Sequence, residues 1–263
     1  MSNDSESHSE LLSRIEIVDV YSIEPHEEYI PEILEKLVHD IMVSKVLKDP
    51  ILADVNRGFV IDGTHRLLAL RKLNIRYIPV LNLDYLKEKI LLGRWFRGFN
   101  NPDVLKIIEK NFDVRQINKF DIGYIDKLSL SIIYNKCIYE IPSGEWYVSL
   151  KNIDRLLKIF RPDFIADSLI HEKIDEYISI ICYRKISRNE ILNIFNRGFK
   201  FSYKTTRHIP SYRILGINMP IKYLTEDKDR CYSYLRGFKL RNVGRGVYID
   251  NRYYEEEVYI AFK

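Results

Sequence analysis

The chain has few cysteines, no long apolar run and a small net charge. Its 263 residues include three cysteines, Cys137, Cys182 and Cys231, which are far apart and lack the CxxC or CxxH spacing of a tetrahedral metal site. This excludes a small disulfide scaffold and favours a reducing compartment. The sequence has no run of about 18 apolar residues, and its first residues are polar and acidic. We therefore expect a cytoplasmic protein with neither a membrane span nor a secretion signal.

The charge balance is close to neutral. Lys and Arg number 41 against 37 Asp and Glu, which gives a formal net charge of +4. A field this weak does not by itself indicate nucleic acid or an anionic membrane as a partner, so partners must be inferred from local patches. The composition, 46% hydrophobic and 30% charged, is globular and excludes a disordered chain or a fibrous repeat.

The hydrophobic spacing divides the chain into a polar tail, two lobes and an extension. Residues 1–13 are rich in Ser and Glu without periodicity, which predicts a flexible tail. Residues 14–100 are predicted to form a first α/β lobe. Its expected elements are a strand at 15–20, a helix from 29 to 41, a hairpin at 51–61, a helix at 64–73 and a strand at 77–83, placed at a sheet edge or begun by Pro79.

Residues 101–225 are predicted to form a second mixed α/β lobe. We expect helices at 103–110, 151–160, 171–175 and 188–199, and strands at 132–141 and 178–184. The polar segment 201–210 has no period, so something other than core packing must hold it. Residues 226–263 form a tyrosine- and arginine-rich extension, in which the alternation around Asn251 predicts a closing hairpin.

A possible anion site begins where a predicted strand gives way to a helix. The segment Asp62-Gly63-Thr64-His65-Arg66 combines a helix N-terminus, a glycine that lets a phosphate approach the backbone, and three donor side chains. Asp62 would serve a divalent cation such as Mg²⁺, which takes one or two protein carboxylates and prefers oxygen ligands. An ordinary strand, Asp cap and helix would have the same spacing, so this alternative stays open.

Carboxylates and an imidazole precede the first predicted helix. Residues 24–28, Glu-Pro-His-Glu-Glu, offer groups that could act as a general base. Acidic residues also favour the first turn of a helix because they meet the positive end of its dipole. Sequence position alone does not decide between these interpretations.

A third candidate lies in the aperiodic segment. Residues 204–208, Lys-Thr-Thr-Arg-His, belong to a stretch from Arg184 to Arg213 with eight basic residues against Glu190 alone. Such a patch would bind a carboxylate or phosphate, or it would be a solvated basic loop. Trp95, with the aromatic residues that follow it, would wall a pocket or simply pack at the end of the first lobe.

Together, these motifs resemble a known family. The segment 60–66, VIDGTHR, resembles the DGHHR-type box of the ParB/sulfiredoxin-like superfamily, and the segments 25–27 and 201–208 resemble those of its free serine kinases. The three motifs occur in the family's order between about residues 15 and 224. The resemblance implies an α+β fold with a ParB/sulfiredoxin-like N-terminal lobe, and it leaves the last forty residues without a counterpart.

The resemblance also implies an activity: phosphorylation of free L-serine to O-phospho-L-serine, an entry to cysteine synthesis, with Mg²⁺ and with ADP or ATP as donor. It assigns catalysis to Glu27 and Asp62, and Asp62 also to the metal. The residues that it assigns to the nucleotide and its phosphates are Ser44, Gly63, Thr64, His65 and Arg66. Those that it assigns to the amino acid or its phosphate are Trp95, Lys204, Thr206, Arg207 and His208. Thr64 replaces the family's first box histidine, so a role specific to imidazole would be lost there.

A ParB-like nucleotide-binding regulator that binds DNA is the alternative. It would use the 184–213 patch and the basic stretch 236–245. No helix-turn-helix with a short glycine turn is evident, and the net charge is modest for a DNA clamp, so we do not expect nucleic acid as the partner. The expected partners are L-serine and a nucleotide, with no membrane, and the sequence leaves the oligomeric state open.

Overall fold

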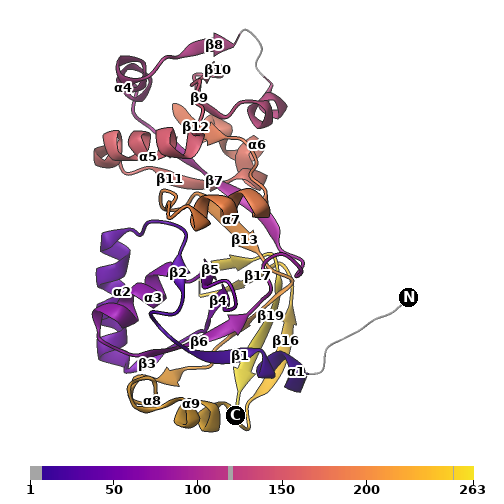
Figure 1. Ribbon diagram of the computed structural model, residues 1–263. Coiled ribbons are helices and arrows are strands. Elements are labelled where there is room, and N and C mark those ends of the chain that lie inside the picture. Colours follow the sequence, from indigo (N-terminus) through magenta and orange to yellow (C-terminus); the bar gives the residue numbers. More distant parts are fainter. Residues whose placement is uncertain (1–7, 118–120, 251) are drawn as a thin grey trace. The chain divides into compact units, whose positions relative to one another are not determined.

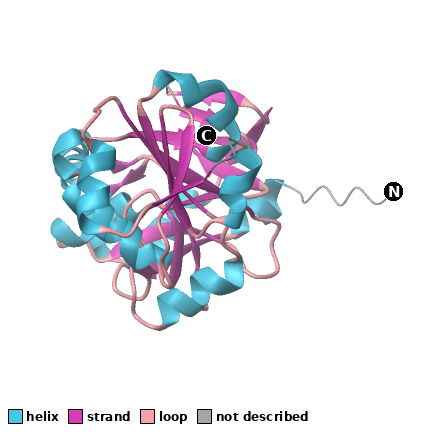
Figure 2. Ribbon diagram, turned by 90° about the horizontal axis from the view of Figure 1, so that it is seen from above, coloured by secondary structure: helices cyan, strands magenta, loops and turns pink. Residues whose placement is uncertain are grey.

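The computed structural model describes residues 8–117, 121–250 and 252–263, and the chain forms two compact units. Unit 1 comprises Met1–Leu91 and His208–Lys263, and unit 2 comprises Leu92–Arg207. The chain therefore leaves unit 1 near the start of β7 (Leu91–Phe99) and returns to it within β13 (Thr206–Ile209). The C-terminal segment, expected to stand outside both lobes, belongs to unit 1. The chain contains many helices and many strands (Figure 2), which confirms the α+β class.

A five-stranded mixed sheet forms the centre of unit 1, in the order β1-β6-β4-β5-β2. Its strands are β1 (Ile15–Asp19), β2 (Glu24–Pro25), β4 (Ile51–Asp54), β5 (Phe59–Asp62) and β6 (Tyr77–Asn82). The expected hairpin is confirmed, because β4 and β5 pair antiparallel around a turn that ends at Gly58, whose φ is +62°. Nearly every residue of β4, β5 and β6 is buried, as in strands covered on both faces.

Two helices, α2 (Pro31–Ser44) and α3 (Thr64–Lys72), lie side by side against this sheet (Figure 1). Helix α2 begins at a proline, whose fixed φ suits the first helical turn, and ends at Lys45 in the left-handed conformation. Its residues Leu34, Val38 and Ile41 recur at helical spacing and are buried. The two helices predicted at residues 29–41 and 64–73 are therefore confirmed.

The last third of unit 1 forms a second, three-stranded sheet in the order β14-β19-β16. The central strand, β19, runs parallel to β14 and antiparallel to β16. The closing hairpin is confirmed as β17 and β18, although Asn251 itself lies outside the described residues. The remaining elements of unit 1 are α1 (His8–Ser13), β3 (Val46–Leu47), β14 (Tyr212–Leu215), β15 (Met219–Pro220), α8 (Ile221–Glu226), α9 (Lys228–Leu235), β16 (Lys239–Gly244), β17 (Val247–Ile249), β18 (Arg252–Tyr254) and β19 (Glu257–Phe262).

Unit 2 is built on an antiparallel sheet in the order β11-β7-β12-β9-β10-β8, with β13 beside β7. Its strands are β7, β8 (Arg115–Ile117), β9 (Leu130–Tyr134), β10 (Cys137–Glu140), β11 (Asp163–Ala166), β12 (Ser179–Tyr183) and β13. Its α-helices are α4 (Val104–Asn111), α5 (Trp146–Leu156), α6 (Ile170–Lys173) and α7 (Arg188–Asn196). Short 3₁₀ turns lie at Ile122–Lys127, Lys158–Phe160, Asp167–Leu169 and Ile174–Glu176.

Three local expectations require correction. Residues 8–13 of the expected tail form α1 because Leu11 is buried, whereas residues 1–7 lie outside the described part of the chain. The strand expected at 132–141 is a hairpin, since Asn135 and Lys136 both adopt positive φ, as a two-residue turn requires. Strand β6 lies between β1 and β4 and not at an edge, with Pro79 just before its first residue paired to β4.

The three cysteines are free thiols, and Cys182 and Cys231 are buried. Among the residues that the structure describes, no helix is long and apolar enough to cross a membrane.

Candidate functional site

Glu27 and Asp62 lie at the same edge of the five-stranded sheet. Strands β2 and β5 are parallel, with Pro25 opposite Val60, so the chain segments that carry these two carboxylates leave the sheet in the same direction. Glu27 follows the end of β2 by two residues, and Asp62 ends β5. Because the carboxyl ends of neighbouring parallel strands meet at one edge, the topology brings the two predicted catalytic residues together.

His26 contacts β5 and lies beside Glu27. Its Nδ1 donates to the carbonyl oxygen of Val60 at 2.8 Å, so the neutral ring keeps Nε2 as an acceptor, 3.8 Å from Glu27 Oε1. Burial lowers the pKa of His26, and the negative charges of Glu27 and Asp62 oppose that shift. A buried neutral imidazole therefore stands within the field of both carboxylates.

Helix α3 begins directly after Asp62, and Gly63 is required at that junction. Its φ is +111°, and a Cβ there would lie 2.4 Å from Cγ2 of Ile51, so any other residue would clash. Thr64 is the first residue of α3, where backbone N–H groups lack partners within the helix. His65 accepts from the backbone N–H of Ile30 at 3.0 Å, which ties the box to the loop entering α2.

Three guanidinium groups surround Asp62. Arg213 donates to Asp62 Oδ2, while Arg252 and Arg66 bring a guanidinium nitrogen within 3.6 and 3.8 Å of the same oxygen. Burial alone would raise the pKa of Asp62, but these three positive charges hold it well below its ordinary value. Asp62 is therefore ionised, and Arg213 is held from its other side by Glu256 at 2.5 Å.

The aperiodic segment 201–208 is held by a buried arginine of β7. Arg97 is fully buried and donates to the carbonyl oxygens of Tyr203 and Lys204 at 2.9 and 3.0 Å. Its Nε and Nη2 also form a bidentate pair with Asp154 at 3.0 and 2.9 Å. The hydroxyl of Tyr183 donates to the carbonyl oxygen of Thr205 at 2.7 Å. Polar contacts thus fix this backbone together with core packing, since Phe201 is fully buried against the rings of Trp146 and Tyr147.

Trp95, also on β7, lies beside two cations of that segment. Nζ of Lys204 is 5.1 Å and Cζ of Arg207 is 5.6 Å from the ring centroid of Trp95. Both distances fit cation–π contact. Thr206, the next predicted residue, is buried in β13. Unit 2 therefore places two of the predicted substrate residues, Lys204 and Arg207, beside a third, Trp95, with Thr206 next to Arg207 in β13.

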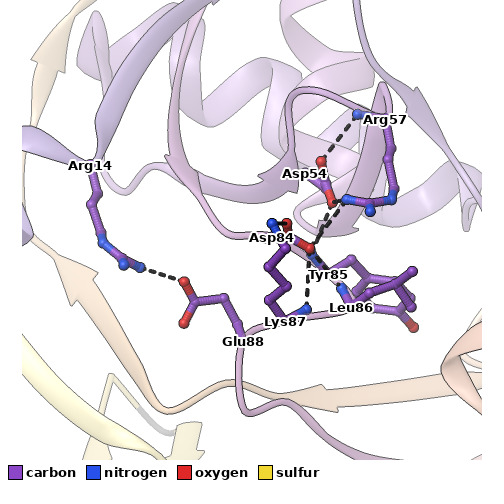
Figure 3. A network of polar contacts seen from close by, with 8 residues as sticks. All are labelled: Arg14, Asp54, Arg57, Asp84, Tyr85, Leu86, Lys87 and Glu88. Carbon is purple, nitrogen blue, oxygen red and sulfur yellow. Dashed lines mark hydrogen bonds and ion pairs between the residues drawn. The ribbon is translucent and has the colours of Figure 1, made fainter.

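His208 belongs to unit 1 and joins the group around Glu27. Its Nε2 is 2.8 Å from the hydroxyl of Tyr85, and its ring meets that of His26 edge to face, with centroids 5.2 Å apart. Buried Asp54 accepts from the backbone N–H of Tyr85 at 2.9 Å and also pairs with Arg57 (Figure 3). A chain of contacts from the β4–β5 turn therefore sets the position of His208.

Ser44 does not lie with this group. It ends α2, about 20 Å along that helix from Pro31 at a rise of about 1.5 Å per residue. Its hydroxyl pairs with the backbone of Val46. The structure therefore separates Ser44 from the loop that carries Glu27.

Several supporting residues were not predicted from the sequence. Arg213 was counted only as one charge of a patch, and neither Glu256 nor the pair of Arg97 and Asp154 carried any local signal. Among residues 8–117, 121–250 and 252–263, no three His, Cys, Asp or Glu side chains are grouped so as to hold a metal. A divalent cation at Asp62 would thus depend on oxygen ligands from a bound phosphate.

Comparison with known proteins confirms the resemblance. No profile of a known family matches the chain. An ATP-dependent L-serine kinase of Staphylothermus marinus is 27% identical over 230 residues, 79% of this chain and 90% of that protein. An ADP-dependent L-serine kinase, SerK, of Thermococcus kodakarensis is 23% identical over 79% of this chain and 91% of that protein. A ParB-like protein of Sulfolobus acidocaldarius is 23% identical over 76% of the chain and 93% of its own length.

The fold is shared with solved serine kinases. A free serine kinase variant in complex with ADP aligns with a TM-score of 0.69 and 18% identity, over 80% of this chain and 93% of that chain. SbnI of Staphylococcus aureus, truncated at its C-terminus, aligns with a TM-score of 0.71 and 18% identity, over 86% and 96%. The chain therefore has the fold of the free serine kinases of the ParB-like group, as the motifs led us to expect.

Replacing Asp154 tests how the segment 201–208 is held. Asp154→Ala leaves the buried Arg97 charge uncompensated, and we expect the free energy of unfolding to fall by about 3–5 kcal/mol. Limited trypsin digestion of the folded variant should also show faster cleavage after Lys204. Glu176→Ala removes an exposed pair with Lys173 and should cost no more than about 1 kcal/mol. Equal losses in the two variants, measured by urea denaturation, would contradict this assignment.

The depressed pKa of Asp62 predicts a pH-dependent stability. Ionised Asp62 stabilises the fold at every pH above its unfolded pKa of about 3.9, and this contribution is lost as the pH falls through the lower folded-state pKa. Asp62→Asn should therefore lower the free energy of unfolding at pH 7, and its difference from wild type should shrink below pH 4. Urea denaturation at both pH values measures this, with exposed Asp40→Asn as the charge-matched control. A difference that does not change with pH would refute the ion-pair account.

Proposed function

We propose that this protein is a kinase that transfers a phosphoryl group from ADP or ATP to free L-serine, giving O-phospho-L-serine. The observation that carries the proposal is the placement of Glu27 and Asp62 at one sheet edge, directly before the glycine-led N-terminus of α3. The curated relatives named L-serine kinases support the choice of substrate, and they include both an ATP-dependent and an ADP-dependent enzyme.

In this proposal, Glu27 orients the serine hydroxyl and accepts its proton. A serine hydroxyl is a poor nucleophile at neutral pH, and a positioned general base contributes about 10²- to 10⁴-fold in rate. His26 Nε2, 3.8 Å from Glu27 Oε1, would then help to hold the transferred proton. His26 acts here through Glu27 and is a positioning residue.

The start of α3 would bind the phosphates of the nucleotide. An anion at this position would meet the backbone N–H groups after Gly63 and the positive end of the helix dipole. The side chains of Thr64, His65 and Arg66 would add further hydrogen-bond donors. Thr64 can still donate a hydrogen bond where the family has histidine, so we expect activity to survive this replacement. The resemblance also assigns Ser44, at the end of α2, to the nucleotide.

Phosphoryl transfer depends on positioning and on cations, because its transition state is loose and spreads charge over the equatorial oxygens. When bound, Mg²⁺ would neutralise part of that charge, with Asp62 as its protein carboxylate and the phosphates supplying further oxygens. The resemblance assigns Trp95, Lys204, Thr206, Arg207 and His208 to serine or its phosphate. Discrimination against threonine would rest on one methyl group, which is worth only about 1–3 kcal/mol.

The product would enter cysteine synthesis, and we expect the reaction in the cytoplasm, where nucleotides and reduced thiols are available. A ParB-like nucleotide switch that binds DNA is the second candidate, supported by the ParB-like relative of Sulfolobus acidocaldarius. A steep salt dependence of duplex binding would favour this second function.

A direct assay tests the proposal. The protein is incubated with L-serine, Mg²⁺ and either ADP or ATP, and phosphoserine is detected by mass spectrometry. We expect product with at least one of the two donors, and the same reactions without Mg²⁺ test the metal requirement. Absence of product with both donors, together with salt-dependent duplex binding, would move the assignment to the regulator.

Glu27→Gln tests the base. The amide keeps the size of the side chain but cannot accept the proton, so nucleotide affinity should stay within about twofold while turnover falls by about 10²-fold or more. Exposed Glu32→Gln, in the first turn of α2, is the matched control and should retain wild-type turnover. Phosphoserine formation and ADP titration calorimetry measure the two quantities. Wild-type turnover in Glu27→Gln would show that another group is the base.

A further inference from the structure

The C-terminal hairpin of unit 1 brings a third arginine to Asp62. Strand β18 is anchored by Tyr254, which is buried in a small core with Leu215 and Val258. Arg252, two residues before Tyr254, stacks over that ring at 4.8 Å and brings its guanidinium within 3.6 Å of Asp62 Oδ2. The hairpin thus carries a cation from the end of the chain to the box between β5 and α3.

The three arginines around Asp62 are held very differently. Arg66 donates to the backbone carbonyl of Pro50 at 2.6 Å, and its side chain is 18% exposed. Arg213 is 3% exposed and donates to both Asp62 and Glu256. The Arg252 side chain is 51% exposed, and its distance of 3.6 Å from Asp62 is too long for a hydrogen bond. Arg252 is therefore the arginine whose contact with Asp62 is most easily exchanged.

The local charges favour an anionic ligand at this position. A guanidinium nitrogen of each of three arginines lies within 4 Å of Asp62 Oδ2, so a ligand that approaches this oxygen meets three positive charges. An exposed ion pair such as that of Arg252 contributes only about 0–1 kcal/mol to stability, so the fold itself gains little from it. A planar guanidinium can bind a phosphate through two parallel hydrogen bonds. An arginine that leaves a carboxylate for a phosphate therefore still has a negatively charged partner.

We propose that Arg252 binds the terminal phosphate of the nucleotide donor, exchanging its contact with Asp62 for non-bridging phosphate oxygens. The inference rests on the proposed function and adds the C-terminal hairpin to the nucleotide site. The backbone at the start of α3 holds the phosphate nearer the nucleoside, and the arginine beside Asp62 meets the phosphate that is transferred.

Titration calorimetry of the full chain with ADP, ATP and AMP tests this role. Arg252→Gln should weaken ADP and ATP binding about tenfold, equivalent to about 1.4 kcal/mol, and change AMP binding less than twofold. Arg252→Lys keeps the charge without the planar fork and should recover part of the loss. Arg245→Gln removes an exposed arginine in the turn between β16 and β17 and is the matched control, expected to bind all three nucleotides like wild type.

The outcomes separate the inference from the proposed function. Unchanged ADP and ATP affinity in Arg252→Gln, or an equal loss for AMP, would overturn the role of Arg252 even if the wild type makes phosphoserine. If the wild type makes no phosphoserine but Arg252→Gln loses affinity only for ADP and ATP, the inference holds and the choice of serine as acceptor fails. Urea denaturation of each variant checks that the hairpin remains folded, since Arg252 is half exposed and its loss should leave stability unchanged.

Discussion

One buried cation organises the candidate site of unit 1. Arg213 is almost fully removed from solvent, and a guanidinium in that position is costly unless carboxylates neutralise it. The two carboxylates come from 151 residues earlier, Asp62, and 43 residues later, Glu256. Since each partner is needed to satisfy the same charge, the end of β5, strand β14 and the start of β19 must meet. The charge around Asp62 that a ligand would meet therefore depends on the pairing of Arg213 with Asp62 and Glu256.

Unit 2 also contains a buried arginine neutralised by a carboxylate, and there it holds the segment 201–208. Arg97 is also buried, and Asp154 neutralises it through a bidentate pair. Burial alone would lower the pKa of Arg97, but Asp154 and Tyr183 hold it above its ordinary value. The guanidinium also donates to the backbone carbonyls of Tyr203 and Lys204. A permanently charged group is well suited to this task, because it offers five donors in a fixed plane to a segment without regular structure.

The parts that could be predicted from the sequence are those with local causes. The β4–β5 hairpin follows from its turn residues, α2 from the spacing of Leu34, Val38 and Ile41, and the strand-to-helix junction after Asp62 from its glycine. Neighbouring parallel strands then bring Glu27 and Asp62 together. These features depend on residues a few positions apart, so a single sequence carries them.

The remaining features depend on pairings across long stretches of chain. Nothing near Arg213 in the sequence identifies Asp62 as its partner, and the parallel pairing of β14 with β19 returns the extension to unit 1 against the expected boundary at residue 226. Ser44, which the resemblance assigns to the nucleotide, stands at the end of α2, at the opposite end of that helix from Glu27. The order of the motifs along the chain therefore gives neither the long-range ion pairs nor the distance that α2 places between Ser44 and Glu27.

The same pairings bear on the choice between a small anion and DNA. Counted along the sequence, residues 184–213 have a large positive excess, but several of these charges are matched by carboxylates from elsewhere in the chain. The pairs are Lys185 with Asp126, Arg197 with Glu145, and Arg213 with Asp62 and Glu256. Duplex binding gains its affinity from many phosphate contacts at once. Lys204 and Arg207, gathered over a single tryptophan, instead form a compact pair of cations on the scale of one amino acid or one phosphate.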